Sequence, residues 1–147
     1  MAAPMQSLAS GTAVISNKCG VPVFVTSVDS TVGATTQLTA GATWTEALHY
    51  DPKAGIAIKV TTSEDGLYNG SPTLTLGYTL NNGENSVYYD LSSAFGLDPL
   101  FAANKLTLAT SKASCPSATW DHVTSVPIQN SKACIGDSID VVLTLCA

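Results

Sequence analysis

Asp90, Asp98 and Tyr88 are the side chains whose types and spacing could best serve a ligand site in this sequence. A carboxylate such as that of Asp90 could bind a sugar hydroxyl or a cation, but an aspartate that ends a strand commonly caps the following turn. Asp98 precedes Pro99, and this pair is expected to cap one helical turn that runs through Ala103. We therefore favour structural roles for both carboxylates and keep ligand binding as the alternative.

Two tryptophans could stack on sugar rings, since a flat apolar face complements a pyranose. Trp44 alternates within a half-buried strand, so we expect it in the core. Trp120 is expected to be more open, and with Asp121 and His122 it forms a candidate recognition surface on a loop.

The sequence gives little support for a metal site or for a catalytic nucleophile. His49 with Asp51 and Asp121 with His122 offer ligand types, but neither pair has a spacing typical of a metal site. The sequence contains no Gly-x-Ser-x-Gly elbow. We predict no metal, no cofactor and no catalytic residue.

Asp90 and Tyr88 belong to an expected β-hairpin over residues 73–96. In its first arm the large side chains alternate with Thr and Gly, and Val87, Tyr89 and Leu91 continue the alternation in the second arm. One face therefore belongs to a core, while Tyr88 and Asp90 share the polar face with Glu84. The reversal falls at residues 81–83, an Asn-Asn-Gly sequence.

The rest of the chain also reads as short strands with little helix. Strands are expected at 12–16, 21–28, 55–61, 105–110, 119–126 and 138–146, and a second hairpin at 35–38 and 43–48. About nine or ten strands imply an all-β sandwich or barrel. We expect a loose leader at residues 1–11 and one domain at residues 12–147.

Composition narrows the class of partner. The net charge is −5, only 12% of residues are charged, and no basic cluster is present. Nucleic acid and membrane partners are therefore not expected. The four cysteines form no CxxC pair and suggest two disulfides in a secreted protein, but spacing leaves three connectivities open. Asn69 begins an Asn-Gly-Ser glycosylation sequon.

The sequence resembles thaumatin-like proteins over about residues 12–101. The motifs are GTAVISNKCGVPVFVTSV, QLTAGATWTEAL, GIAIKV and the pair SPTLTLGYTL with SVYYDLSSAFG. In size and in its terminal cysteine it is similar to the fungal yeast-phase-specific protein family, a group of short secreted proteins with a thaumatin-like core. That resemblance implies a two-disulfide antiparallel β-sandwich in which Cys19 pairs with Cys146 and Cys115 with Cys134.

The resemblance also implies where a ligand cleft would lie. Larger thaumatin-like proteins have an acidic cleft that is associated with β-glucan binding and weak glucanase activity. Here the cleft arginine falls near Gly70, the glutamate on Gly77 and one aspartate on Val87. Asp90 alone matches an acid, while the next aspartate falls near Phe95, with Asp98 as a shifted replacement. Ordinary glycoside hydrolysis needs two carboxylates.

We therefore expect a secreted or cell-wall fungal protein, a monomer without enzymatic activity, that acts by binding to a cell-wall polysaccharide or a host surface protein. A β-1,3-glucan-binding protein or weak glucanase that uses Asp90 and Asp98 is one alternative. An inhibitor or effector of a host protein, with residues 111–132 as its contact, is another.

Overall fold

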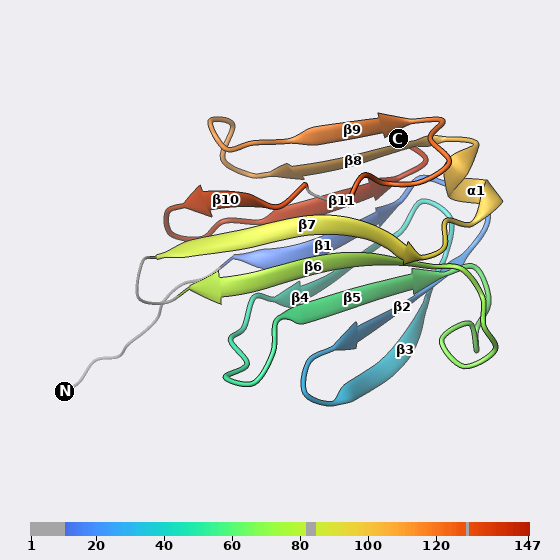
Figure 1. Ribbon diagram of the computed structural model, residues 1–147, viewed down its shortest axis with the longest axis horizontal. Helices are drawn as coiled ribbons and strands as arrows, with labels where there is room; N and C mark the ends of the chain where they lie inside the picture. Colours follow the sequence, from blue (N-terminus) through green and yellow to red (C-terminus); the bar gives the residue numbers. More distant parts are fainter. Residues whose placement is uncertain (1–10, 82–84, 129) are drawn as a thin grey trace.

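The protein is a sandwich of two β-sheets in a computed structural model that describes residues 11–81, 85–128 and 130–147 (Figure 1). The strands of the first half are β1 Thr12–Asn17, β2 Val23–Val28, β3 Val32–Leu38, β4 Thr43–Ala47, β5 Ile56–Thr61 and β6 Thr73–Asn81. Those of the second half are β7 Ser86–Phe95, β8 Lys105–Thr110, β9 Ala118–Asp121, β10 Lys132–Ile135 and β11 Val141–Leu145. The expected all-β sandwich is confirmed.

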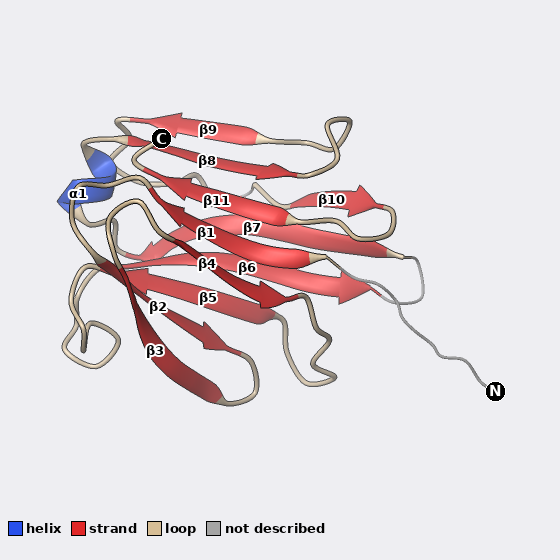
Figure 2. Cartoon of the chain, turned by 180° about the vertical axis from the view of Figure 1, so that it is seen from behind, coloured by secondary structure: helices blue, strands red, loops and turns tan. Residues whose placement is uncertain are grey.

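The two sheets divide these strands unequally. The five-stranded sheet has the order β4-β1-β11-β8-β9, and the six-stranded sheet has the order β10-β7-β6-β5-β2-β3. Seen from behind, β1, β4 and β11 pass in front of β6 and β7 (Figure 2). Most neighbours are antiparallel, but β1 and β11 pair in parallel in the centre of the five-stranded sheet. The first and last strands of the chain therefore lie side by side.

The core lies between the sheets and follows from the period-2 alternation of the strands. From the six-stranded sheet, Ile58, Leu76 and Tyr89 are at most 1% exposed, and Ile15 and Leu143 from the facing sheet are fully buried. Large apolar side chains that alternate with Thr and Ser can bury one face only, so the outer faces of both sheets carry mainly polar and small residues.

Both expected disulfides are formed. Cys19 is joined to Cys146 and Cys115 to Cys134. Asn17 explains the Asn-x-Cys motif of the first strand, because its buried amide nitrogen donates to the carbonyls of Val21 and Leu38 at 3.0 and 3.1 Å, while its oxygen accepts the N–H of Cys19. The turn that presents Cys19 to the last strand is therefore fixed by one side chain.

Two local expectations were wrong. The hairpin expected at 35–38 and 43–48 does not form, because β3 pairs with β2 while β4 crosses to the other sheet and pairs with β1. Residues 132–135 form an edge strand, β10, at a place where the sequence predicts none. Residues 1–10 of the expected leader and residues 82–84 of the hairpin turn, with Glu84, lie outside the described residues.

Candidate functional site

Tyr88 and Asp90 point away from the core on the outer face of the six-stranded sheet. Both belong to β7, whose inward residues Val87, Tyr89 and Leu91 are buried. Tyr88 is 40% exposed and Asp90 is half-buried. They line a shallow hollow of about 260 Å³, which we call the Asp90 hollow. The central hairpin thus places the two candidates together, as the alternation predicts.

Asp90 faces Gly77 across the β6–β7 pair. A side chain at position 77 would collide with the Asp90 carboxylate, so glycine there gives the carboxylate its room. In this chain a glycine therefore stands opposite the aspartate where the resemblance would place a second acid. The two positions cannot hold two carboxylates in the present arrangement of side chains.

Asp90 does not end a strand, so its expected role as a turn cap is wrong. β7 continues to Phe95, and no described residue donates a hydrogen bond or forms an ion pair with the Asp90 carboxylate. Burial raises the pKa of Asp90 above its ordinary value, and the positive charge of Lys132 lowers it in part. The Asp90 carboxylate is therefore partly desolvated but makes no hydrogen bond or ion pair within the described fold. Such a group is available to bind a ligand.

Asp98, by contrast, is occupied within the fold. It is the N-cap of the short helix α1, Pro99–Ala102, as the sequence predicts. One carboxylate oxygen accepts the N–H of Leu100 at 2.9 Å and the other accepts the hydroxyl of Thr62 at 2.8 Å.

The two carboxylates also lie too far apart to act together. Asp90, Gly77 and Ala57 share one row across the sheet, whereas Asp98 bonds to Thr62, which lies five residues beyond Ala57. At about 3.3 Å per residue this places Asp98 roughly 16 Å along the sheet. Glycosidase pairs are separated by about 5–10 Å. Asp90 and Asp98 are therefore too far apart to act as the two carboxylates of a glycosidase.

Trp120 is not the open platform expected from the sequence. It lies on β9 and is only 7% exposed, because strand alternation turns it into the core while Thr119 and Asp121 face outward. The Lys132 ammonium lies 5.7 Å from the centre of its ring. Asp121 and His122 are exposed and bond to each other. Trp44 is half-buried and packs against the core, as expected.

A polar cluster that the sequence analysis missed joins β2, β4 and β6. The Tyr78 hydroxyl donates to Glu46 Oε2 at 2.9 Å and lies 3.1 Å from His49 Nδ1, while Asp29 Oδ2 lies 3.3 Å from His49 Nε2. Burial and the negative charge of Glu46 raise the pKa of Tyr78. His49 therefore contacts Asp29 rather than its sequence neighbour Asp51. Within the described residues, no three His, Cys, Asp or Glu side chains converge as metal ligands.

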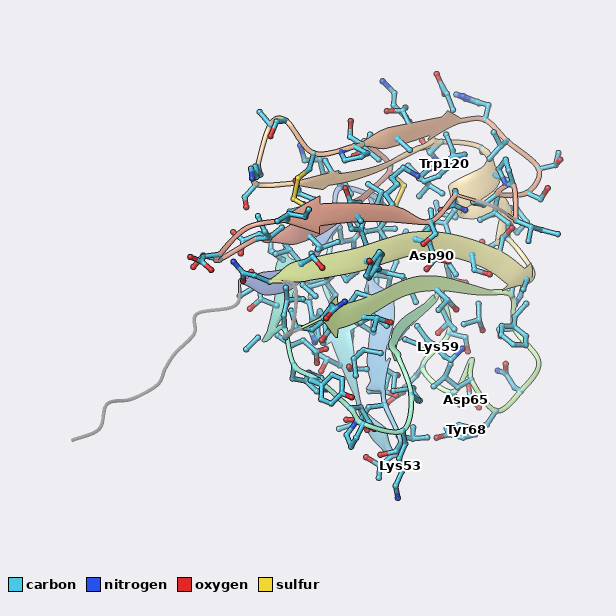
Figure 3. The ribbon with its side chains drawn as sticks, turned by 60° about the vertical axis from the view of Figure 1, so that its left-hand side comes forward. Lys53, Lys59, Asp65, Tyr68, Asp90 and Trp120 are labelled. Carbon is cyan, nitrogen blue, oxygen red and sulfur yellow. A yellow bond between two sulfur atoms is a disulfide. The ribbon has the colours of Figure 1, made fainter. Side chains whose placement is uncertain are left out.

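A larger groove opens on the same outer face. Its residue Lys59 lies on the other side of β6 from Asp90 (Figure 3). The groove has a volume of about 400 Å³. We call it the Lys59 groove, and it is lined chiefly by Val28, Val32, Lys59, Leu67, Tyr68 and Phe95. The residues come from four strands and from the loop that follows β5, so no local pattern could reveal it. Its one sequence signal is Lys59, the sole charged residue within the apolar strand IAIKVT.

Asn69, the expected glycosylation site, is exposed on the loop that borders this groove. Its amide nitrogen donates to Asp65 at 3.1 Å and its oxygen accepts the N–H of Ser71 at 3.0 Å. The sequon is therefore accessible on the surface, and glycosylation remains a prediction. No helix among the described residues is long and apolar enough to cross a membrane.

Comparisons with known proteins agree with this architecture. The family model described as Bys1, Blastomyces yeast-phase-specific protein, matches residues 1–147. The crystal structure of the protein elicitor MoHrip2 from Magnaporthe oryzae is similar, with a TM-score of 0.76 and 27% identity over 94% of this chain and 100% of that one. The thaumatin-like xylanase inhibitor TLXI has a TM-score of 0.67 and 18% identity, over 92% of this chain and 99% of that one. No curated protein matches the sequence.

Proposed function

Because the chain belongs to the family of Blastomyces yeast-phase-specific proteins, we propose that it is a secreted protein that acts by binding rather than by catalysis. Its contact surface is the outer face of the six-stranded sheet around the Asp90 hollow. The partner is a protein on a host surface. Two disulfides in a chain of this size support an extracellular location.

One observation carries this proposal. The Asp90 carboxylate is held partly buried, has no partner among the described residues, and stands beside the exposed ring of Tyr88. An aromatic ring next to an unsatisfied charge is typical of a binding surface, where the partner supplies the missing donor. A second carboxylate at hydrolytic distance is lacking on this face of the described chain, since Asp98 is used as a helix cap.

The likeness to a structure described as a protein elicitor supports a host protein as the partner. A cell-wall polysaccharide is the second candidate. The observation that favours it is the pairing of Tyr88 with Asp90, since a ring face and a carboxylate can hold a sugar ring and its hydroxyls. Inhibition of a host protein through residues 111–132 is the third candidate, and the 94% exposed Ile128 would be its contact.

The test compares binding to a host cell-surface preparation with binding to insoluble β-1,3-glucan. We expect the wild-type protein to bind the host surface and to release no reducing ends from the glucan. The double variant Tyr88→Ser/Asp90→Asn should lose that binding. Thr45→Ala, at an exposed position on β4 of the other sheet, is the matched control and should retain it. Reducing ends released by the wild type and lost in Asp90→Asn would overturn the proposal.

A further inference from the structure

We propose that the Lys59 groove binds a small organic carboxylate that carries an aromatic or alkyl body, with the carboxylate paired to Lys59 Nζ. The site is separate from the Asp90 hollow, and its occupancy does not depend on the binding function proposed above. Four sets of observations lead to this ligand class.

The first is the concentration of exposed apolar side chains. Tyr68 is 78% exposed, Phe95 66% and Val32 55%, and all three line this one groove. Large exposed side chains scattered singly need no explanation, but a cluster of them around a concave surface commonly marks a ligand or interaction site. The neighbouring outward positions of β6 are Thr75, Gly77 and Thr79, so the apolar cluster differs from the polar and small residues beside it.

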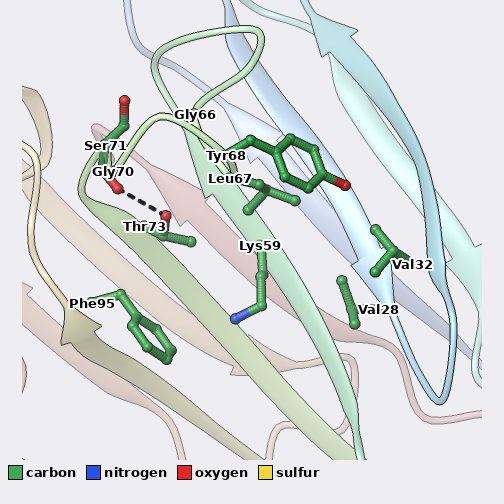
Figure 4. Close-up of a pocket in the computed structure, with 10 residues that line it drawn as sticks. All are labelled: Val28, Val32, Lys59, Gly66, Leu67, Tyr68, Gly70, Ser71, Thr73 and Phe95. Atoms are coloured by element: carbon green, nitrogen blue, oxygen red, sulfur yellow. Dashed lines mark hydrogen bonds between the residues drawn. The ribbon is translucent and has the colours of Figure 1, made fainter.

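The second is the placement of one cation among these apolar groups. Lys59 extends from the middle of β5, between Thr26 of β2 and Thr75 of β6. Figure 4 shows its ammonium end between Phe95 on one side and Val28 on the other. The Nζ atom lies 4.7 Å from the centre of the Phe95 ring.

The third is that this cation lacks a counterion. Among the described residues, no carboxylate lies within ion-pair distance of Lys59, and its ammonium lies over the Phe95 ring. Partial burial lowers the pKa of Lys59, with no nearby charge acting in the opposite direction. A partly desolvated ammonium is stabilised by an anion, and the ring face supplies only a fraction of that stabilisation.

The fourth is the combination of size and charge, which selects among anions. A volume of about 400 Å³ falls in the range of small-molecule sites, roughly 300–1,000 Å³. A single cation matches a monoanion better than a phosphate, and the apolar walls favour a ligand with an apolar body over a free inorganic ion. The net charge of −5 opposes polyanions. Lys59 itself disfavours cationic ligands.

The experiment is a titration of the isotope-labelled protein at pH 7, followed by amide NMR. The carboxylate probes are 4-phenylbutyrate for the aromatic class and octanoate for the alkyl class. The neutral amide 4-phenylbutanamide is the matched control ligand. We expect a dissociation constant on the order of 1 mM for at least one carboxylate. The backbone amide signals that shift should belong to Lys59, Phe95 and residues 66–71. The neutral control ligand, 4-phenylbutanamide, should bind about tenfold more weakly than 4-phenylbutyrate.

Two variants isolate the charge. Lys59→Met keeps an unbranched apolar chain and should weaken carboxylate binding about tenfold without changing the affinity for the neutral amide. Lys59→Arg should restore most of the affinity. Lys53→Met removes an exposed lysine outside the groove and should have no effect. The proposal is overturned if no carboxylate binds, if the shifted amides lie elsewhere, or if Lys59→Met and Lys53→Met bind the carboxylates equally.

Discussion

The two disulfides should contribute unequally to stability, and the difference can be worked from the sequence spans that they close. The Cys19–Cys146 disulfide spans 127 residues and the Cys115–Cys134 disulfide spans 19. In the chain-entropy model these loops correspond to about 4.9 and 3.2 kcal/mol at 25 °C. We therefore expect Cys19→Ala/Cys146→Ala to lose about 1.7 kcal/mol more than Cys115→Ala/Cys134→Ala.

The packing cost of the substitutions should largely cancel in this comparison. Each disulfide has one buried and one half-buried cysteine, with Cys19 4% and Cys134 1% exposed. The assay is urea unfolding of both double variants, with the fully reduced wild-type protein as a reference that lacks both loops. Equal losses, or a larger loss for the shorter span, would refute the entropic reasoning and indicate that local strain or packing dominates.

Three further predictions concern single side chains, and urea unfolding measures the change in stability in each case. The folded pKa of Asp90 is raised above 3.8, so its contribution to stability is present below that pH and is lost as the pH rises through the folded pKa. Asp90→Asn should remove this dependence and should not destabilise the protein at pH 7; a large loss there would show that the carboxylate has a structural partner. Asn17→Ala should cost about 3 kcal/mol, since buried carbonyls and the Cys19 N–H lose their partner, and a loss below about 1 kcal/mol would contradict this role. Asp98→Ala should lower the free energy of unfolding by about 1–2 kcal/mol because a helix cap is lost, with no change in ligand binding. Unchanged stability together with lost ligand binding would instead assign Asp98 to a binding site.

The positions of the strands that bury one face can be predicted from the sequence. Which strands pair with each other can be predicted only in part. Alternation in β6 and β7 indicates both the hairpin and the outward direction of Asp90. A turn sequence at Gly41 is compatible with a next strand that pairs with β3 and with one that crosses to the facing sheet. The pairing of β4 with β1 therefore could not be predicted from the turn. The burial of Trp120 is not predictable from sequence, because a strand of four residues shows too little alternation to reveal its inward face.

The candidate sites were less predictable, for a physical reason. Asp90 was identified from its hairpin, but its lack of a partner depends on Gly77 in the neighbouring strand. The Lys59 groove combines Val28, Tyr68 and Phe95 from distant segments. Surface sites of this kind depend on which outward side chains become neighbours across a sheet, and strand order and register determine that arrangement.

The parallel pairing of β1 with β11 has a consequence for how the protein is made. The six-stranded sheet can gather most of its strands early, and β4 can pair with one edge of β1. The other edge of β1 must wait for β11, and Cys146 is synthesised 127 residues after Cys19. At about 5–20 residues per second, roughly 6–25 s pass before the ribosome supplies that partner. During this interval β1 lacks one of its two neighbouring strands, and Cys19 lacks its native disulfide partner. Chaperones and thiol oxidation in the secretory compartment would therefore act on a chain whose five-stranded sheet still lacks β11.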